Sequence, residues 1–213
     1  MKHLIMIGAG GFGRECYWHA RESIGFGTEF DLKGYLDDTP AGELREDLLQ
    51  MPRIGTIDEY EIQPDDVFIC TIGSPQGKYQ IVNRLRSQWG GEVQFINLIH
   101  RTAIVHPTVK LGTGIVLCPH VNINDNAAIG DHVCLNVASG CGHDASIGDF
   151  TSVMARCDIC GNVEIGERAY IASSVVLIPH SKVESDAYVG AGSVVLKRVK
   201  AGRKVFGAPP FEI

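Results

Sequence analysis

The feature that most constrains the fold is a six-residue period in the second half of the chain. From Ala103 to Lys204 the sequence divides into 17 consecutive hexads without an insertion. The third place is Val, Leu or Ile in 15 of them, with Cys141 and Ala201 as the exceptions, and the first place is always small, β-branched or Cys. Six residues rotate an α-helix by about 600°, so this period cannot keep one helical face apolar.

Glycine marks one place in the hexads at intervals of 18 residues. It fills the fourth place at residues 112, 130, 148 and 166, and again at 202. A chain that turns a corner every six residues explains these positions, because three hexads then complete one coil. Coils of this kind bury their third residues and stack on one another as repeats. The pattern predicts a parallel β-helix with turn-tolerant residues in the fourth place.

The first half of the chain predicts a small α/β domain. Apolar runs typical of strands alternate with segments that can form helices, and this alternation is typical of a parallel sheet. The expected strands are 3–7, 32–38, 66–73 and 93–99, and the expected helices are 14–24 and 77–89. This sheet is about half the size of a full dinucleotide-binding fold, which has two mononucleotide halves.

The expected domains are therefore a half-Rossmann domain over 1–97 and a β-helix with a C-terminal cap over 98–213. The net charge of −6 argues against nucleic acid as a partner, because such binding needs a dense basic face. No apolar run approaches the ~20 residues of a membrane helix, so no membrane span is expected. Seven cysteines, an odd number, indicate reduced thiols and a cytoplasmic protein.

The order of motifs resembles a known group of enzymes. The segments GAGGFGRE, YLDD, TIGSPQGK and INLIH precede hexads of the form [LIV]-G-x-x-x-x. This order is similar to that of hexapeptide-repeat sugar acyltransferases of the sialic acid O-acetyltransferase type. The group includes bacterial N-acetyltransferases that act on UDP-linked 4-amino sugars in the bacillosamine pathway. The resemblance implies a left-handed β-helix, a homotrimer and acetyl-CoA as the acyl donor.

The segment HDASIGDF contains the candidate catalytic pair, His143 and Asp144. Histidine suits general-base catalysis because its pKa lies near the operating pH, and an adjacent carboxylate can orient the ring. From the residues alone, a surface histidine at a repeat corner stays the alternative, because most histidines in a chain with eight are not catalytic. In similar enzymes a His followed by an acid, just ahead of x-x-I-G-[DE]-F, is the base. The resemblance therefore implies that His143 is the base and Asp144 its partner.

The resemblance also implies contacts to the acetyl donor. Relatives often carry a second histidine nine residues after the base, and this chain has Ser152 there, which is shorter and cannot be cationic. Backbone contacts are implied at Ser173 and Ala191. The segment 196–204 contains five basic residues and is either a contact for the donor's phosphates or a solvated cap.

A glycine-rich turn near the start predicts a phosphate site. Gly8, Gly10 and Gly13 satisfy G-x-G-x-x-G between a strand and a helix, where a phosphate can approach backbone amides. Because the second mononucleotide half is missing, a nucleoside diphosphate is favoured over NAD. The resemblance implies a nucleotide-sugar site lined by Gly8, Ala9, Gly10, Asp37, Asp38 and Gly73.

No metal site is expected. Cys157 and Cys160 form a C-x-x-C motif, but Cys157 and Cys141 occupy the small first and inward third places of their hexads, where cysteine serves as a core residue.

Together these features predict an acetyl-CoA-dependent acetyltransferase that acts on the amine of a nucleotide-linked amino sugar by direct attack. Three alternatives stay open. One is O-acetylation of a sugar hydroxyl, as on sialic acid. Another is a nucleotide-sugar-binding protein without catalysis. The third is a small NAD-dependent oxidoreductase.

Overall fold

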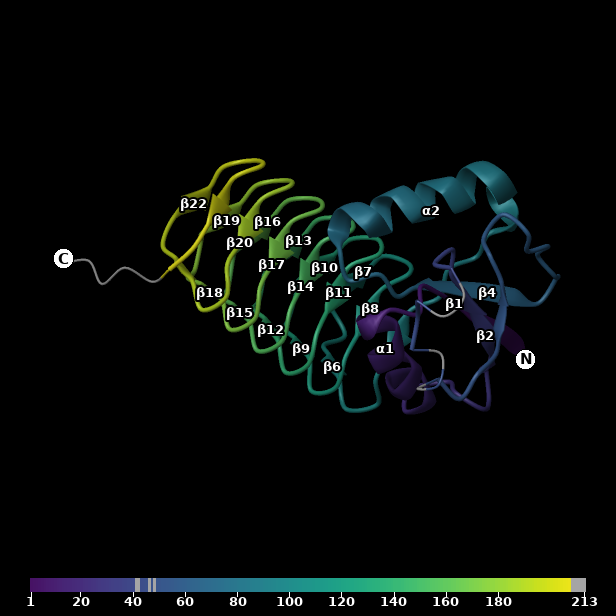
Figure 1. The fold of residues 1–213 in the computed structure, drawn as a ribbon. Helices are drawn as coiled ribbons and strands as arrows, with labels where there is room; N and C mark the ends of the chain where they lie inside the picture. Colours follow the sequence, from purple (N-terminus) through teal and green to yellow (C-terminus); the bar gives the residue numbers. More distant parts are fainter. Residues whose placement is uncertain (41–42, 46, 48, 208–213) are drawn as a thin grey trace. The chain divides into compact units, whose positions relative to one another are not determined.

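The computed structural model describes residues 1–40, 43–45, 47 and 49–207 (Figure 1). The chain forms two compact units, Met1–Arg101 and Thr102–Ile213. Their division falls four residues beyond the boundary expected from the sequence. The last six residues of the expected C-terminal cap, 208–213, lie outside the described part.

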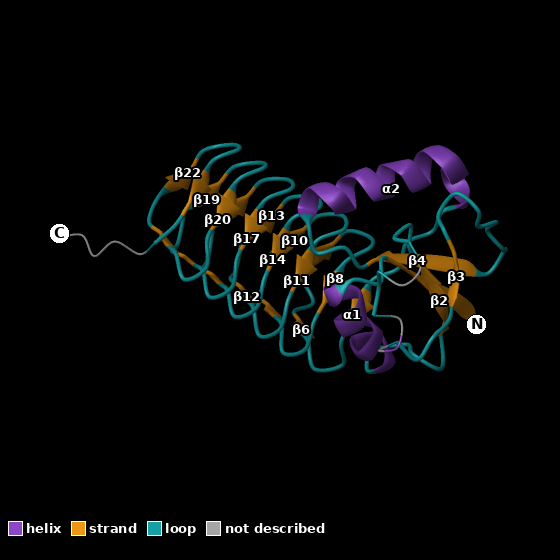
Figure 2. Cartoon of the chain, viewed as in Figure 1, coloured by secondary structure: helices purple, strands orange, loops and turns teal. Residues whose placement is uncertain are grey.

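Unit 1 is built on a parallel four-stranded sheet with the order β3-β2-β1-β4. Its elements are β1 (Lys2–Ile7), α1 (Gly11–Arg21), β2 (Phe30–Leu36), β3 (Arg53–Gly55), β4 (Asp66–Cys70), α2 (Pro75–Trp89), the 3-10 helix η2 (Gly90–Glu92) and β5 (Leu98–Ile99) (Figure 2). The parallel sheet confirms the predicted half-Rossmann arrangement. In the described part of the chain, no helix is both long enough and apolar enough to cross a membrane.

In unit 1 one strand was missed, and one strand prediction was wrong in extent. β3 was missed because it is a three-residue strand at the edge of the sheet, too short to show a period. The strand expected over 93–99 is reduced to β5, although Phe95 makes an isolated parallel bridge to Phe68.

The core of unit 1 follows from its apolar strands. β1 reads as a continuous apolar run, and its residues Ile5 and Ile7 are buried together with Phe68 of β4. Leu85 of α2 packs into the same cluster. Burial on both faces of the central strands requires such unbroken apolar runs, which is why these strands were visible in the sequence.

Unit 2 is a parallel β-helix whose coils have three faces. The first face contains β6 (Ile104–Val105), β9 (Asn122–Ile123), β12 (Gly140–Cys141), β15 (Asp158–Ile159), β18 (Val176–Leu177) and β21 (Val194–Val195). The second face contains β7 (Lys110–Leu111), β10 (Ala128–Ile129), β13 (Ser146–Ile147), β16 (Glu164–Ile165), β19 (Lys182–Val183) and β22 (Arg198–Val199). The third face contains β8 (Val116–Leu117), β11 (Cys134–Leu135), β14 (Ser152–Val153), β17 (Tyr170–Ile171), β20 (Tyr188–Val189) and β23 (Lys204–Val205).

The coils stack in register, and the labelled strands of each face follow one another along the domain (Figure 1). Before the last coil, each third-place residue pairs with the third-place residue of the next coil, as Cys141 does with both Ile123 and Ile159. These three side chains and Leu177 are at most 1% exposed. A column of buried aliphatic groups therefore runs along the inside of each face, as the hexad pattern predicted.

The prediction that the corner's turn-tolerant residue is the fourth one was wrong. The left-handed backbone conformation falls on the sixth place, at every sixth residue from Gly114 to Gly192. There the chain turns its N–H toward the preceding coil, so that Asp144 N, for example, donates to Asp125 O at 3.0 Å. Fourth-place glycines have another cause, which is the close approach of the next coil. A Cβ on Gly130 would stand 2.8 Å from the backbone nitrogen of Asp149.

The uninterrupted hexad frame was also wrong in the last coil. β22 begins four residues after β21 instead of six, so Arg198 pairs with Lys182 only sixteen residues before it. Val199, not Ala201, is therefore the buried inward residue of the second face. This explains why Ala201 was an exception to the third-place rule.

Candidate active site

His143 and Asp144 lie at the first corner, the turn between the first and second faces, after β12 and before β13. The imidazole Nδ1 lies 2.8 Å from Asp144 Oδ2, and the two side chains are 65% and 45% exposed. Asp144 holds the left-handed sixth place, with φ of 58°. That turn brings its carboxylate back onto the ring of the preceding residue, as a base and its orienting acid require.

The environment of Asp144 keeps it ionised. The side-chain amide of Asn126 donates to its Oδ1 at 2.7 Å, and this bond, together with the one to His143, holds the pKa of Asp144 below its ordinary value. An ionised Asp144 accepts a proton-bearing Nδ1, which assigns the Nδ1–H tautomer to the neutral ring. Nε2 is then the nitrogen with a free lone pair, as a general base requires.

Gly161 lies against the other edge of the imidazole. A Cβ built on Gly161 would stand 2.6 Å from Nε2 and 2.7 Å from Cε1 of His143. The ring therefore occupies space that any other residue at 161 would fill. Neither Gly161 nor Asn126 was singled out from the sequence, although each lies about one coil away from the dyad. Because residues 18 apart lie on neighbouring coils, counting 18 residues back from Asp144 and 18 forward from His143 would have found them.

The residues expected to contact the acetyl donor do not gather around His143 within the chain. Ser152 lies in β14 on the third face and is fully buried. Ser173 and Ala191 lie on successive coils at the corner between the third and first faces, and the Ser173 carbonyl accepts the N–H of Gly192 at 3.0 Å. Each chain thus presents the base at one corner and these two backbone positions at another.

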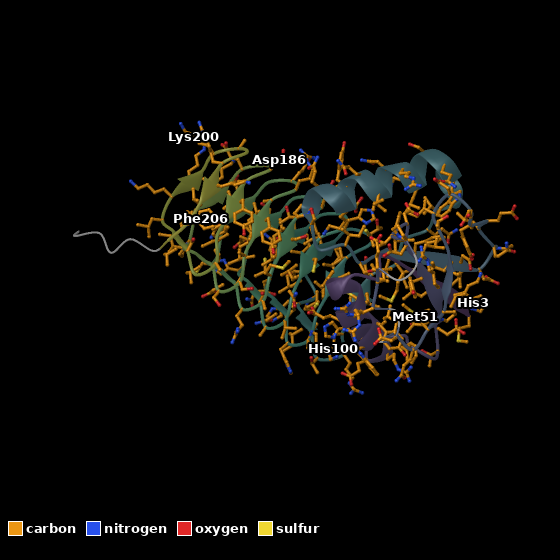
Figure 3. All side chains as sticks on the ribbon, viewed as in Figure 1. His3, Met51, His100, Asp186, Lys200 and Phe206 are labelled. Carbon is orange, nitrogen blue, oxygen red and sulfur yellow. The ribbon has the colours of Figure 1, made fainter. Side chains whose placement is uncertain are left out.

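The basic segment surrounds a cavity in the last coils. The cavity measures about 430 Å³ and is lined by apolar residues such as Val194, Leu196 and Phe206, together with Lys197 and Arg198. Lys200 and Phe206 both belong to this C-terminal end of the repeat, where Figure 3 labels them. Apolar walls with cationic side chains suit a ligand that has an organic arm and phosphates.

A second cavity, of about 380 Å³, lies in unit 1 at the carboxyl ends of β1, β2 and β4. Ligands of open α/β sheets bind at such edges. Five of the six residues predicted for the nucleotide-sugar site line it, namely Gly8, Gly10, Asp37, Asp38 and Gly73.

The glycine-rich turn has the conformation that its sequence suggests. Gly8 has φ of 96°, and a Cβ on Gly13 would stand 2.2 Å from the Gly8 carbonyl oxygen, so α1 packs directly on the turn. A Cβ on Gly10 would meet nothing within 4 Å, which leaves this side of the turn open to the cavity. No side chain caps the start of α1, so its first N–H groups remain available to an anion.

The two acids at the end of β2 are anchored by the protein itself. Asp37 accepts the backbone N–H groups of Ala9 at 2.6 Å and Thr39 at 2.8 Å. Ala9, the sixth predicted residue, therefore donates its amide to Asp37. Asp38 accepts from Ile57 N at 2.9 Å. Burial opposes ionisation of Asp38, but the Ile57 amide and a guanidinium outweigh it and lower its pKa.

Two arginines that were not singled out from the sequence hold this acidic loop. Arg84 supplies the guanidinium that binds Asp38, and it also binds Asp58. Arg53 donates to the carbonyl oxygens of Asp37 and Thr39 at 2.6 and 2.7 Å. Both acids at the end of β2 are thus held by bonds within the protein.

The cysteines of the repeat are buried, except for Cys160, which is half-buried. Cys141 is fully buried, which raises the pKa of its thiol to about 12. Burial also raises the pKa values of the Cys157 and Cys160 thiols. Within the described residues, no group of three His, Cys, Asp or Glu side chains is placed to hold a metal ion.

Two family models match separate parts of the chain. Residues 3–85 match the PglD N-terminal domain, and residues 144–179 match the bacterial transferase hexapeptide with its six repeats. The first match lies in unit 1 and the second in unit 2. The hexapeptide match begins at Asp144 and so includes half of the dyad.

Solved structures share this architecture over nearly the whole chain. The acetyltransferase domain of PglB from Neisseria gonorrhoeae is 25% identical, with 97% of both chains covered and a TM-score of 0.85. WeeI from Acinetobacter baumannii is also 25% identical, with 97% of both chains covered and a TM-score of 0.84. PerB from Caulobacter crescentus, solved with CoA and GDP-perosamine, is 24% identical over 97% of this chain and 95% of PerB, with a TM-score of 0.83. These matches confirm the predicted fold, a half-Rossmann sheet followed by a left-handed parallel β-helix.

Curated relatives match over shorter lengths. GDP-perosamine N-acetyltransferase of Escherichia coli O157:H7 is 32% identical over 127 residues, which are 57% of each protein. An uncharacterized mimivirus protein, L142, is 29% identical over 131 residues, and the chain spans only 24% of its length.

Proposed function

We propose that this protein is an acetyl-CoA-dependent N-acetyltransferase whose acceptor is the amine of a nucleotide-linked amino sugar. The observation that carries the proposal is the His143–Asp144 dyad, with Nδ1 bound to the carboxylate and Nε2 turned away from it at an exposed corner. The combination with a cavity lined by Gly8, Gly10 and Asp37 supports a nucleotide-bearing acceptor. The neighbour PerB was solved with CoA and GDP-perosamine, and another neighbour, the PglB domain, with acetyl coenzyme A.

In this mechanism the amine nitrogen of the sugar attacks the thioester carbonyl carbon. His143 Nε2 accepts the proton that the nitrogen loses, and Asp144 stabilises the imidazolium that forms. The carbon–sulfur bond breaks, the CoA sulfur leaves with the electron pair and takes up a proton, and an amide results. A general base of this kind contributes about 10²- to 10⁴-fold to the rate. The buried thiols of Cys141 and Cys157, with their raised pKa values, favour this direct transfer over an acyl-cysteine intermediate.

The residues that line the two cavities support an assignment of the acceptor and donor sites. Unit 1 binds the nucleotide through the turn at Gly8, Ala9 and Gly10 and the loop at Asp37, Asp38 and Gly73. The apolar cavity near Phe206, with Lys197 and Arg198, suits the pantetheine arm and phosphates of the donor. The sugar acetyltransferases of the sialic acid type remain the group that the motifs resemble.

We further propose that the active enzyme is a homotrimer. His143 lies at one corner of its coil, whereas Ser173 and Ala191 lie at another. A donor site that includes all three residues is complete only when two chains face each other. The seven free cysteines, together with the nucleotide sugar and acetyl-CoA that the reaction uses, support a cytoplasmic location.

The test is CoA release from acetyl-CoA with UDP- and GDP-linked 4-amino sugars and with matched hydroxyl acceptors. His143→Ala should lose at least about 100-fold in kcat. His120→Ala is the control, because His120 is an exposed histidine at a different corner, and its left-handed backbone, with φ of 61°, is one that alanine also adopts at Ala138. Turnover only with hydroxyl acceptors would refute N-acetylation. Nucleotide binding without turnover by any acceptor would refute catalysis and favour a binding protein.

A further inference from the structure

A ladder of side chains links the dyad to the two preceding coils. Thr108, Asn126 and Asp144 occupy the sixth place of successive coils at the first corner, 18 residues apart. Thr108 Oγ1 accepts the backbone N–H of Asn126 at 2.8 Å. Asn126 Nδ2 then donates to Asp144 Oδ1 at 2.7 Å, and Asp144 Oδ2 lies 2.8 Å from His143 Nδ1. The four groups form one chain of hydrogen bonds that ends at the base.

The two carboxylate oxygens of Asp144 have separate partners. Oδ1 accepts from Asn126 and Oδ2 faces the imidazole, so the Asn126 bond fixes the rotation of the carboxylate. Without that bond, either oxygen of the exposed carboxylate can face the ring, and the ring loses a fixed orienting partner. The neighbouring acid, Asp125, does not replace Asn126, because its carboxylate faces His106 at 3.2 Å and Thr108 at 3.3 Å.

We propose that Asn126 is a positioning residue for acetyl transfer, which holds Asp144 in the orientation that aligns His143. The inference rests on the proposed function, because it names a residue that acts through the proposed base.

The coil does not need this side-chain bond in order to form. Asn162 holds the equivalent place one coil after Asp144, with φ of 59° against 57° for Asn126. Its backbone N–H donates to the His143 carbonyl at 2.9 Å, and its side chain makes no hydrogen bond within the described part of the chain. The corner is therefore closed there by the backbone alone. The hydrogen bond from the Asn126 side chain to Asp144 is therefore not needed to form the corner.

The experiment compares Asn126→Ala with Asn162→Ala. The two variants are matched because both remove an asparagine from a left-handed sixth place at the same corner, and Ala138 shows that alanine is accepted in such a place, with φ of 57°. Two quantities are measured for each variant, the kcat and KM of CoA release and the titration of the Asp144 carboxyl carbon by NMR. Thermal unfolding reports whether both variants remain equally folded.

The expected result is a kcat about tenfold lower for Asn126→Ala, with KM nearly unchanged, because the base contributes about 10²- to 10⁴-fold and only its alignment is impaired. The Asp144 titration should move to higher pH in Asn126→Ala and stay in place in Asn162→Ala. Equal kcat values and equal titrations in the two variants would overturn the proposal. If the wild type transfers no acetyl group to any acceptor, the proposed function fails, while the NMR titration still decides whether Asn126 holds Asp144.

Discussion

Replacement of Gly161 by alanine tests whether the imidazole of His143 depends on the space beside it. The new Cβ would stand 2.6 Å from Nε2, 2.7 Å from Cε1 and 3.1 Å from Cδ2. Ordinary non-bonded contacts lie at about 3.5 to 4.0 Å, so the ring must move by about 1 Å or swing away from Asp144. A misplacement of about 1 Å can reduce a rate by about 100-fold, and we expect a loss of that size in kcat.

The same substitution should hardly change stability. The His143 side chain is 65% exposed, so the ring can swing into solvent without leaving a cavity in the core. The free energy of unfolding should change by no more than about 0.5 kcal/mol, as for other surface substitutions. The assay is steady-state CoA release, paired with a thermal unfolding curve for each variant.

Gly91→Ala is the control, because a Cβ on Gly91 has no atom within 4 Å. It should match the wild type in both measurements. A Gly161→Ala variant whose kcat stays within about twofold of the wild type would refute the reasoning, because the ring would then tolerate the displacement. A large fall in melting temperature would refute it as well, since the loss of rate would then follow from unfolding.

Three further predictions concern single groups. Asp66→Asn should destabilise unit 1 by about 2 kcal/mol in denaturant unfolding, because the buried Asp66 carboxylate accepts a charged hydrogen bond from Lys33 at 2.7 Å. Burial opposes ionisation of Asp66, but the pKa of its carboxyl is nevertheless lowered. The stabilisation is therefore present at neutral pH and is lost as the pH falls below about 4. Asp144→Asn should lower kcat by at least about tenfold at every pH from 6 to 9, because the lowered pKa of Asp144 keeps it ionised throughout that range, and a loss confined to low pH would contradict this role. A thiol-alkylating reagent should modify Cys160 first among the cysteines of the repeat, because the others are buried, and Cys160→Ala should retain acetyl transfer, whereas a complete loss of activity in this variant would point to an acyl-cysteine.

The repeat was predictable because its physical cause is local and strictly periodic. A residue such as Ile159 or Leu177 must be apolar wherever it faces the narrow interior, and that requirement repeats every six residues. The corner was less predictable, because the left-handed sixth place accepts His120, Ala138 and Asp144 alike and thus has no compositional signature. Glycine was visible in the fourth place for a different reason, which is the approach of the next coil.

In the candidate site, only the residues that belong to a short sequence motif could be predicted. His143 and Asp144 are adjacent in sequence, so the pair could be found without a structure. Asn126 and Gly161 belong to other coils, and only the stacking register brings them to the dyad. In unit 1 the same holds for Arg84, which reaches Asp38 from α2 and carries no motif of its own.

The shortened last coil shows which part of this architecture can change in length. From β6 to β21 every strand follows its predecessor by six residues, so an inserted module of 18 residues would leave all later strands in phase. The four-residue step from Val194 to Arg198 breaks that phase by two residues. The strand register nevertheless recovers after the step, because Val199 pairs with Val183 and Val205 with Val189. The step removes two residues from one corner while the stacking of the second and third faces continues, so the length of a corner and the register of the faces can vary separately.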